Sequence, residues 1–330
     1  MHIDDAVTVY LEHRETECSP ATVQSYRYRL RFFVDWCENQ GLEEVEEIDA
    51  QDVHEYKTWR SEGLAKPTIK SQMDTLRSFL RYMERLDYTE ENLHESAVSP
   101  TLQGKENIRE DIVETDQAKQ ILERLDRYRF ASKEHVLFLI AWRTAARTGA
   151  LRALDLRDYD SNEQYLRFVN RPDTDTRLKN GDNGERLVAL REETCTVLDE
   201  FIENKRYDVT DEHGRRPLLA SKMGRIAKNT IRGWMYRLTR PCWYADDCPH
   251  DRDQSECEAA VNDSYSYECP SSTAAHSVRR GSVTHMLRED VPKTAVSDRV
   301  DCSVDVLEKH YSQLSERDKM ETRRQYLDGL

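Results

Sequence analysis

The chain lacks any long apolar run. Its longest uninterrupted apolar stretch, Val136–Trp142, is seven residues long, whereas a helix that spans a bilayer needs about 20. No basic segment followed by an apolar stretch stands at the N-terminus, so we expect no secretory signal, a cytoplasmic location and few disulfides. These absences exclude a membrane-embedded protein and disfavour a secreted one.

Lysine is also scarce, since it supplies 13 of the 49 basic residues and arginine supplies 36. Arginine can hold a phosphate through two parallel hydrogen bonds, and few strongly hydrated ammonium groups suggest a salt-loving source. The net charge of -14 repels a polyanion such as DNA at long range, which argues against DNA binding. In molar salt the Debye length falls to about 3 Å, so local arginine clusters would decide whether DNA binds.

At 330 residues the chain is long enough for two domains. Residues 1–88 show four amphipathic helical segments, of which the clearest begins with Ser19 as N-cap and Pro20 as first helical residue and ends at Gly41. Periodicity fails over residues 89–112, which we interpret as a linker. The remainder, 113–330, is mainly helical. Two short alternating runs at 165–170 and 186–190 predict a β-hairpin in it.

Basic residues gather on the faces of two predicted helices in the first domain and again near residue 280. These faces could follow a DNA backbone, although a merely solvated helix face is an equally good interpretation of any single segment. The candidate DNA-binding residues are Arg27, Arg31, Lys70, Arg77, Arg81 and Arg280.

The second domain contains a set of residues in an informative order. His276 and Arg279 form a His-x-x-Arg box, and Tyr311 follows near the C-terminus. Upstream, Arg147 lies in a small-residue turn before Leu154-Asp155-Leu156, and Lys179 precedes an Asn-Gly turn between the two predicted strands. In these motifs the chain resembles the tyrosine recombinases, the phage integrase and Xer superfamily. The resemblance covers nearly the whole chain, and the acidic, lysine-poor composition further suggests a haloarchaeon or its virus or plasmid.

The resemblance implies a mainly α fold, with an N-terminal helical core-binding domain that clamps DNA and a catalytic domain that carries a small β-hairpin. It also implies that Tyr311 attacks a phosphodiester and forms a 3′-phosphotyrosine, without ATP or a catalytic metal. Two arginines, Arg147 and Arg279, would neutralise the charge of the transition state. His276 would assist the phenol, and Lys179 would protonate the leaving 5′-hydroxyl.

The resemblance implies double-stranded DNA attachment sites as substrates, a homotetramer on DNA and accessory DNA-bending proteins, with no membrane partner. Integration or excision of a mobile element is the use we expect. A Xer-like resolution of replicon dimers is an alternative in the same chemistry. A catalytically silent, zinc-stabilised DNA-binding protein is an alternative of a different class.

Other residues compete for the assigned roles, and each assigned residue alone could be an ordinary helix cap, turn lysine or packed aromatic. The competitors for the first arginine, the histidine and the tyrosine are Arg143, Arg152, Arg157, His285, His310 and Tyr326. The chain also departs from the family pattern twice. Ala150 stands three residues after Arg147, where the family often has an acid. Cys302 stands nine residues before Tyr311, where the family usually has His or Trp, so Cys302 or Arg299 would supply that support.

Residues 241–270 form a polar insertion that is rich in cysteine. Four thiols in such a segment could bind a structural zinc ion, because zinc prefers four soft ligands and the metal would order a loop that is too polar to fold alone. Surface thiols or a redox pair are the alternatives. The candidate ligands are Cys242, Cys248, Cys257 and Cys269, with His250 as a substitute.

Overall fold

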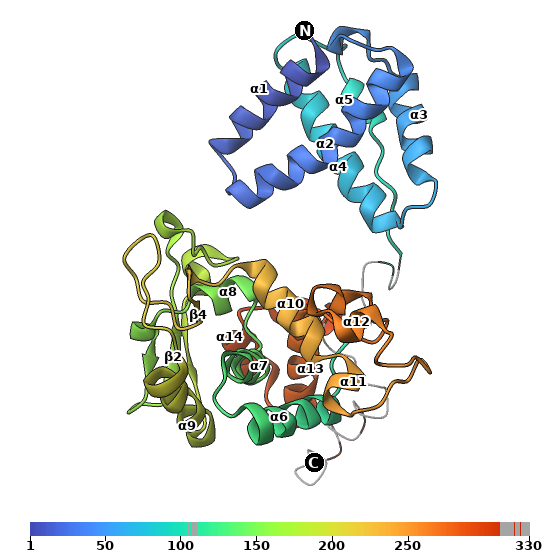
Figure 1. The fold of residues 1–330 in the computed structure, drawn as a ribbon. Helices are drawn as coiled ribbons and strands as arrows, with labels where there is room; N and C mark the ends of the chain where they lie inside the picture. The colour runs from blue at the N-terminus through green and yellow to red at the C-terminus, as the bar shows by residue number, and fades with distance from the viewer. Residues whose placement is uncertain (104–105, 107–110, 311–319, 321–323, 325–330) are drawn as a thin grey trace. The chain divides into compact units, whose positions relative to one another are not determined.

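A computed structural model describes residues 1–103, 106, 111–310, 320 and 324. It divides the chain into two compact units, residues 1–109 and 110–330, which are described separately below. Both are built mainly from helices (Figure 1), and the strands form two small antiparallel sheets in the second unit. The mainly helical fold class predicted from the sequence is therefore confirmed. Within the described ranges, no helix is both long and apolar enough to cross a membrane.

The first unit is a helical bundle around one buried cluster. Its helices are α1 (Ile3–Glu15), α2 (Pro20–Gln40), η1 (Val45–Glu47), α3 (Ala50–Ser61), α4 (Lys66–Glu84) and α5 (Leu93–Ser96). The bounds of α2 follow from its ends: Ser19 accepts a hydrogen bond from the backbone N–H of Thr22, Pro20 is the first helical residue, and Gly41 closes the helix at φ +77°. Tyr10, Phe33 and Phe79 are fully buried where α1, α2 and α4 meet.

The predicted linker begins too early. The helix α5 lies inside residues 89–112, and Leu93 and Ala97 belong to the buried cluster of the first unit. Arg77 of α4 donates to the carbonyl oxygen of Ala97, which fixes the chain against the bundle. Sequence periodicity missed this helix because it is only four residues long.

The second unit has ten α-helices among its described residues, and shorter helical turns lie between them. The α-helices are α6 (Thr115–Arg129), α7 (Lys133–Thr144), α8 (Thr148–Ala153), α9 (Glu192–Glu200), α10 (Lys228–Leu238), α11 (Pro241–Tyr244), α12 (Glu258–Val261), α13 (Ala275–Arg288), α14 (Lys293–Val300) and α15 (Val304–His310). The turns are η2 (Leu156–Asp158), η3 (Pro172–Thr174), η4 (Gly181–Gly184), η5 (Phe201–Lys205) and η6 (Asp263–Glu268).

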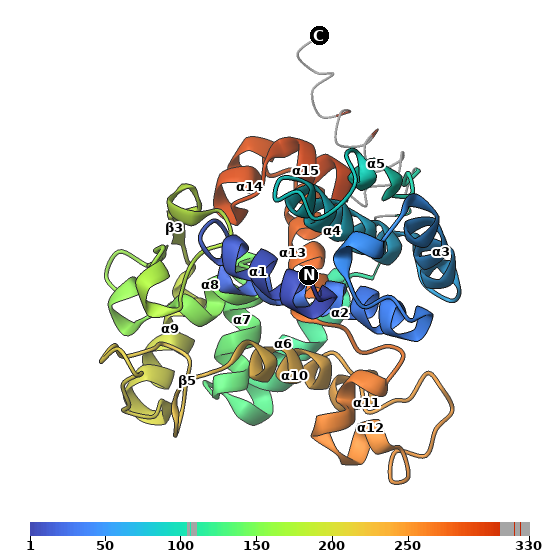
Figure 2. The ribbon, with the colours of Figure 1, turned by 90° about the horizontal axis from the view of Figure 1, so that it is seen from above.

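The apolar helix α7 runs through the middle of this unit (Figure 1), and nearly all its residues are buried. Helices α6 and α13 pack against α7, and α14 and α15 continue from α13 and lie side by side (Figure 2). Gly281 allows the close approach of α13 to the segment before α6, because a side chain there would collide with the backbone of Val113. The helix that carries His276 and Arg279 is thus packed against the core of the second unit.

Three strands form the larger sheet: β1 (Tyr159–Asp160), β2 (Tyr165–Phe168) and β3 (Arg186–Ala189), in that order and antiparallel. The pairing of Tyr165 with Ala189 and of Phe168 with Arg186 confirms the predicted hairpin. A second, two-stranded sheet of β4 (Ala220–Ser221) and β5 (Gly224–Arg225) follows the hairpin and was not predicted from the sequence. Strands of two residues are too short to show an alternating pattern.

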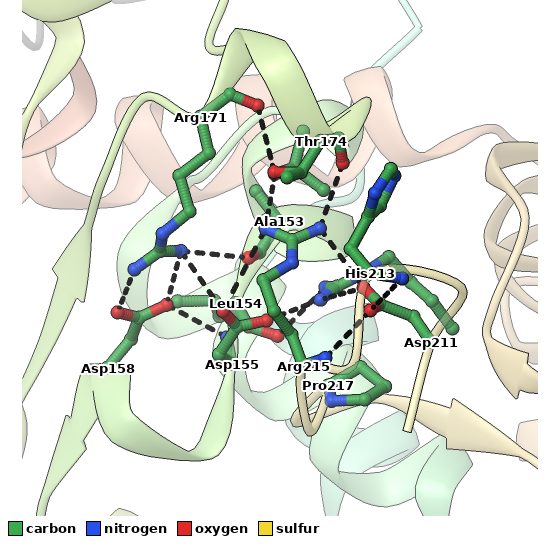
Figure 3. Close-up of polar contacts among 12 residues, drawn as sticks. Ala153, Leu154, Asp155, Asp158, Arg171, Thr174, Asp211, His213, Arg215 and Pro217 are labelled. Carbon is green, nitrogen blue, oxygen red and sulfur yellow. Dashed lines mark hydrogen bonds and ion pairs between the residues drawn. The ribbon is translucent and has the colours of Figure 1, made fainter. Parts of the chain in front are cut away.

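A network of charged side chains anchors the long turn of the β2–β3 hairpin (Figure 3). Asp158 is buried and accepts two hydrogen bonds from the guanidinium of Arg171, at 2.5 and 2.8 Å. Arg215 donates to the carbonyl oxygen of Thr174 and to Asp211. Asp155, which is also buried, pairs with the guanidiniums of Arg225, Arg171 and Arg215. The Leu-Asp-Leu segment after the first arginine therefore serves to hold the hairpin.

Candidate active site

Arg147 lies at the junction between α7 and α8. The helix α7 ends at Thr144, Ala145 turns the chain at φ +49°, and Arg147 is the N-cap residue of α8. Its side chain is 26% exposed, and its Nη1 donates to Oδ2 of Asp301 at 2.6 Å. The short turn thus presents one guanidinium, partly open to solvent, beside the end of α14.

The three competing arginines are engaged elsewhere. Arg152 donates to the carbonyl oxygens of Ile226 and Asp175, so it joins α8 to the smaller sheet region and the hairpin turn. Arg157 is largely exposed and pairs with Asp155 at 3.5 Å. Arg143, in the last turn of α7, lines a cavity of about 520 Å³ that also contains His285. Arg147 is the candidate whose charge acts on His276.

Arg279 occupies the interior of the same region. It is 1% exposed, and its Nη1 donates to the carbonyl oxygen of Ala145 at 2.6 Å and to that of Val300 at 2.8 Å. These two bonds join α13 to the turn that carries Arg147 and to the end of α14. Because the bonds leave little freedom for the guanidinium, Arg279 orders the site in addition to contributing positive charge.

His276 is exposed in the first turn of α13. Although the residue is exposed, nearby protein atoms remove part of its ring from water and disfavour the charged imidazolium, and three guanidiniums add to this effect, so the pKa of His276 falls to about 4. The guanidiniums belong to Arg280, Arg279 and Arg147. At neutral pH the ring is therefore uncharged and can accept a proton.

The competing histidines lie differently. His285 stacks on Trp142 with ring centroids 5.8 Å apart, and its hydrogen bond to Thr115 spans 3.4 Å. Burial lowers the pKa of His285 as well. His310 is the last residue of α15. Of His276 and His285, whose side chains the structure describes, it is His276 whose surroundings include the two assigned arginines.

Lys179 is exposed in the turn between β2 and β3. Its neighbour Asn180 donates from Nδ2 to Oδ1 of Asp301 at 2.6 Å. The backbone N–H of Leu178 donates to the side chain of Asn170, which steadies the other side of the turn. The turn that carries Lys179 is thus joined to the carboxylate that also binds Arg147.

Arg186, at the start of β3, was missed by the sequence reasoning. Its Nε donates to the carbonyl oxygen of Arg299 at 2.7 Å, and its guanidinium lies 4.4 Å from the ring centroid of Phe168. Burial lowers the pKa of Arg186 to about 10, and the nearby charges of Arg279 and Arg147 contribute to this shift. The sequence did contain a signal for Arg186: it is a basic residue at an inward-facing position of a predicted strand.

Cys302 stands where the family usually has His or Trp. It is buried in a small apolar cluster with Val283 and Val296, and burial raises the pKa of its thiol. Arg299, the other candidate for this support, donates to the carbonyl oxygens of Arg143 and Ala189 at 2.9 and 3.0 Å. Whether either residue contacts phosphate stays a prediction.

The assigned nucleophile Tyr311 and its competitor Tyr326 lie outside the described residues. The helix α15 leads to Tyr311, since its last residue is His310. The structure therefore brings together Arg147, Arg279 and His276, and joins the Lys179 turn to them through Asp301.

The basic residues predicted to bind DNA fall into three groups. Arg27, Arg31 and Arg81 are exposed on the first unit. Lys70 and Arg77 flank Asp74 on α4, at 2.7 and 3.7 Å, so part of their charge is neutralised within the helix. The third group is Arg280 alone, which is not on the surface.

Arg280 is buried, and its guanidinium pairs with Asp111 at 3.1 Å. The prediction that it lies on a DNA-binding surface is wrong, because α13 is covered on that side by the chain segment that leads into α6.

The cysteine-rich segment contains four reduced thiols. Cys242 lies in α11, Cys257 precedes α12, and Cys269 follows η6. In the described parts of the chain, no group of three or more His, Cys, Asp and Glu side chains is placed so that it could hold a metal ion. His250, the substitute ligand, lies 3.0 Å from the hydroxyl of Ser271.

Comparison with protein families gives two matches. Residues 8–86 match the phage integrase N-terminal SAM-like domain, and residues 111–316 match the phage integrase family. A tyrosine recombinase XerC of Pelotomaculum thermopropionicum is 27% identical over 213 residues, which cover 62% of this chain and 65% of that protein. The XerC of Oceanobacillus iheyensis is 35% identical over 89 residues, which cover 27% of this chain and 29% of that protein. These matches span less than two thirds of either relative.

Two solved structures have a similar fold. The Tn1549 transposon integrase in complex with a circular intermediate DNA has a TM-score of 0.68 at 14% identity, with 98% of this chain and 99% of that chain covered. A lambda integrase dimer bound to a core site has a TM-score of 0.64 at 12% identity, with 96% and 100% covered. At these identities the likeness shows the fold alone.

Proposed function

Because the chain belongs to the phage integrase family, we propose that it is a site-specific tyrosine recombinase, which cuts and rejoins DNA through a 3′-phosphotyrosine intermediate. The observation that carries the proposal is the convergence of Arg147, Arg279 and His276 in one region of the second unit. The turn with Lys179 is joined to the same region. These residues come from three elements that are far apart in the sequence: the turn before α8, the β2–β3 hairpin and α13.

The chemistry assigns one step to each group. The Tyr311 oxygen forms a bond to the phosphorus, and its proton passes to the neutral ring of His276. The bond between phosphorus and the 5′-oxygen breaks, and Lys179 protonates that oxygen. The guanidiniums of Arg147 and Arg279 stabilise the negative charge on the non-bridging oxygens. The reverse sequence rejoins the strand, so neither ATP nor a metal is consumed.

A suicide substrate tests this proposal. A duplex nicked close to the cleavage site releases a short fragment after cleavage, so the covalent adduct accumulates. We expect the wild-type chain to form an adduct with DNA from its own attachment site in high salt, and Tyr311→Phe to form none. Tyr326→Phe is the matched control and should form the adduct normally. Absence of any wild-type adduct on attachment-site DNA would sink the proposal and favour a silent DNA-binding protein.

We propose integration or excision of a mobile element as the use of this chemistry, on double-stranded attachment sites in the cytoplasm. Resolution of replicon dimers is the second candidate, favoured by the similarity to two XerC proteins. Recombination joins two duplexes, so four protomers would assemble on DNA with accessory bending proteins. The excess of arginine over lysine, 36 to 13, and the net charge of -14 support an origin in a haloarchaeon, its virus or its plasmid.

We further propose that Cys242, Cys248, Cys257 and Cys269 bind one structural zinc ion. The charges of the other three thiols contribute to the raised pKa of Cys242, after burial, so the four sulfurs lie in one neighbourhood. The segment buries few apolar side chains, which leaves a metal as a source of order. The thiols would have to move closer together to bind the ion.

The zinc proposal is tested by metal analysis of the purified chain. We expect one zinc per chain, lost in the Cys248→Ser, Cys257→Ser double variant and kept in the control Cys195→Ser, whose residue lies in α9. Removal of the ion by a chelator should lower the melting temperature of the wild type but not of the double variant. A wild-type chain free of zinc after refolding with the metal would contradict the proposal.

A further inference from the structure

The carboxylate of Asp301 joins two parts of the site that are far apart in the sequence. Its Oδ2 accepts a hydrogen bond from Nη1 of Arg147, and its Oδ1 accepts one from Nδ2 of Asn180, both at 2.6 Å. Its side chain is 11% exposed. One acidic residue therefore holds the first arginine and the turn next to Lys179 in a fixed relation.

The backbone at Asp301 places its side chain between α14 and the hairpin. Asp301 ends α14 in the left-handed region at φ +55°, ψ +64°. Aspartate and asparagine are the non-glycine residues that adopt this conformation most readily, so the turn at the end of α14 is compatible with Asp301. The hairpin is also shaped to this side chain, because Gly184 lies so close that an added Cβ would meet Oδ2 at 3.2 Å.

Several guanidiniums lie in the same region as Asp301. The guanidiniums of Arg147 and Arg186 act on each other and on Asp301, and those of Arg279 and Arg299 add to the same positive region. A carboxylate in this position balances the repulsion between the arginines when no phosphate is bound. An arginine has five N–H donors, so Arg147 can bind Asp301 through one of them and turn others to a phosphate.

We propose that Asp301 is a positioning residue, which orients Arg147 toward the scissile phosphate and, through Asn180, places the Lys179 turn beside the leaving oxygen. The inference rests on the proposed function. It also accounts for Ala150, since the carboxylate that is missing three residues after Arg147 is supplied from the end of α14 instead.

Single-turnover cleavage of the nicked substrate at saturating protein tests the proposal. We expect Asp301→Asn to lower the cleavage rate about 100-fold, the size of effect that follows from a misplacement of about 1 Å. Its DNA dissociation constant should stay close to that of the wild type. Asp301→Glu should recover part of the rate, because it keeps the carboxylate. Asp298→Asn, an exposed aspartate of the same helix, is the matched control and should cleave normally.

A substrate with sulfur in place of the 5′-bridging oxygen separates the effect of Asp301 on Arg147 from its effect on the Lys179 turn. A thiolate leaves without being protonated, so a misplaced Lys179 should no longer matter on this substrate. Asn180→Ala should be slow on the oxygen substrate and as fast as the wild type on the sulfur substrate. The cleavage rate of Asp301→Asn should recover only in part on the sulfur substrate, because the orientation of Arg147 stays disturbed.

Two results would overturn the inference. If Asp301→Asn cleaves as fast as the wild type or faster, its carboxylate merely fills the place of the absent phosphate. If Asn180→Ala cleaves the oxygen substrate normally, the link to the hairpin has no role. Asn180 is exposed, so this variant stays informative even if Asp301→Asn fails to fold. A wild-type chain that forms no adduct would instead refute the proposed function itself.

Discussion

Arg147 is distinguished from its neighbours by what it contacts and by what it leaves free. Its guanidinium is partly exposed, and among the residues that the structure describes it is bound to one carboxylate, which leaves N–H donors that can turn to a ligand. Arg157, by contrast, is exposed and pairs at 3.5 Å with Asp155, the buried aspartate of the Leu-Asp-Leu segment. The two residues therefore give a direct test of which arginine meets the phosphate.

We predict that Arg147→Lys lowers the rate of covalent adduct formation by about 100-fold or more, because lysine cannot make a forked contact with two phosphate oxygens. Arg157→Lys should leave the rate within about twofold, as expected of an exposed ion pair. Both rates are measured in single turnover on the nicked substrate. The reverse result, a slow Arg157→Lys and a normal Arg147→Lys, would move the first arginine to position 157.

The pKa of His276 gives a second prediction for a single residue. In the free protein its ring should titrate near pH 4 rather than 6.5, because packing around the ring and the nearby guanidiniums disfavour the imidazolium. DNA should raise this value, since the phosphate charge opposes the guanidiniums. NMR of the imidazole protons measures the pKa with and without DNA. The His276→Asn or His276→Gln variant identifies the His276 signal by its absence. A midpoint near 6.5 without DNA would mean that the arginines do not act on His276.

The sign of this shift also fixes its effect on stability. The folded pKa lies below the unfolded one, so the unfolded chain binds the proton first as the pH falls. His276 therefore costs no stability above about pH 6.5 and an increasing amount between about pH 6.5 and 4. A neutral His276 at physiological pH is what its proposed role as proton acceptor requires.

At the scale of elements, the β2–β3 hairpin depends on the charged network shown in Figure 3. Burial alone would raise the pKa of Asp211, but N–H groups of Arg215 and His213 and the guanidinium of Arg225 outweigh it and lower the pKa to about 2. The stabilisation by this carboxylate should be present above about pH 4 and be lost as the pH falls to about 2, with a size of roughly 2 kcal/mol.

Urea unfolding of the wild type and of Asp211→Asn at several pH values measures this contribution. We expect the difference in free energy of unfolding to be largest above pH 4, to shrink as the pH falls through about 2, and to disappear below that, where the wild-type carboxyl is protonated as well. Asp208→Asn, whose residue is exposed, is the matched control. A difference that does not change with pH would show that the charge of Asp211 contributes nothing.

Elements with a local signature could be predicted from the sequence, and contacts between distant segments could not. Ser19, Pro20 and Gly41 mark the ends of α2, and the alternating runs around Asn180-Gly181 mark the hairpin. The burial of Arg280 depends on Asp111, a residue more than a hundred positions away, and no periodicity in α13 reveals it. Nothing in the sequence indicated a role for Asp301 beyond its place next to Cys302. Its two partners come from the start of α8 and from the hairpin, which are distant in the sequence.

The two units have separate buried clusters. The cluster of the first unit includes residues between Ile3 and Ala97, and those of the second lie between Val113 and Leu307. No buried apolar residue in these described clusters is shared between the units. Each unit can therefore be expected to fold by itself.

This separation predicts the behaviour of the chain that begins at residue 110. The shortened chain should fold and still form the Tyr311 adduct at high DNA concentration, because the assigned catalytic residues all belong to the second unit. It should bind DNA more weakly and with a smaller salt dependence, since each lost phosphate contact lowers the slope of log K against log salt by about one.

Arg27→Gln with Arg81→Gln in the full chain provides the matched comparison, because both side chains are exposed on the first unit. If these two arginines contact phosphates, the variant should reproduce part of the loss in affinity and reduce the salt slope by about two, while the cleavage rate of the bound complex stays the same. Binding is measured by fluorescence anisotropy over a range of KCl concentrations. If this variant keeps the wild-type affinity and salt slope while the shortened chain binds more weakly, the first unit contacts DNA through residues other than Arg27 and Arg81.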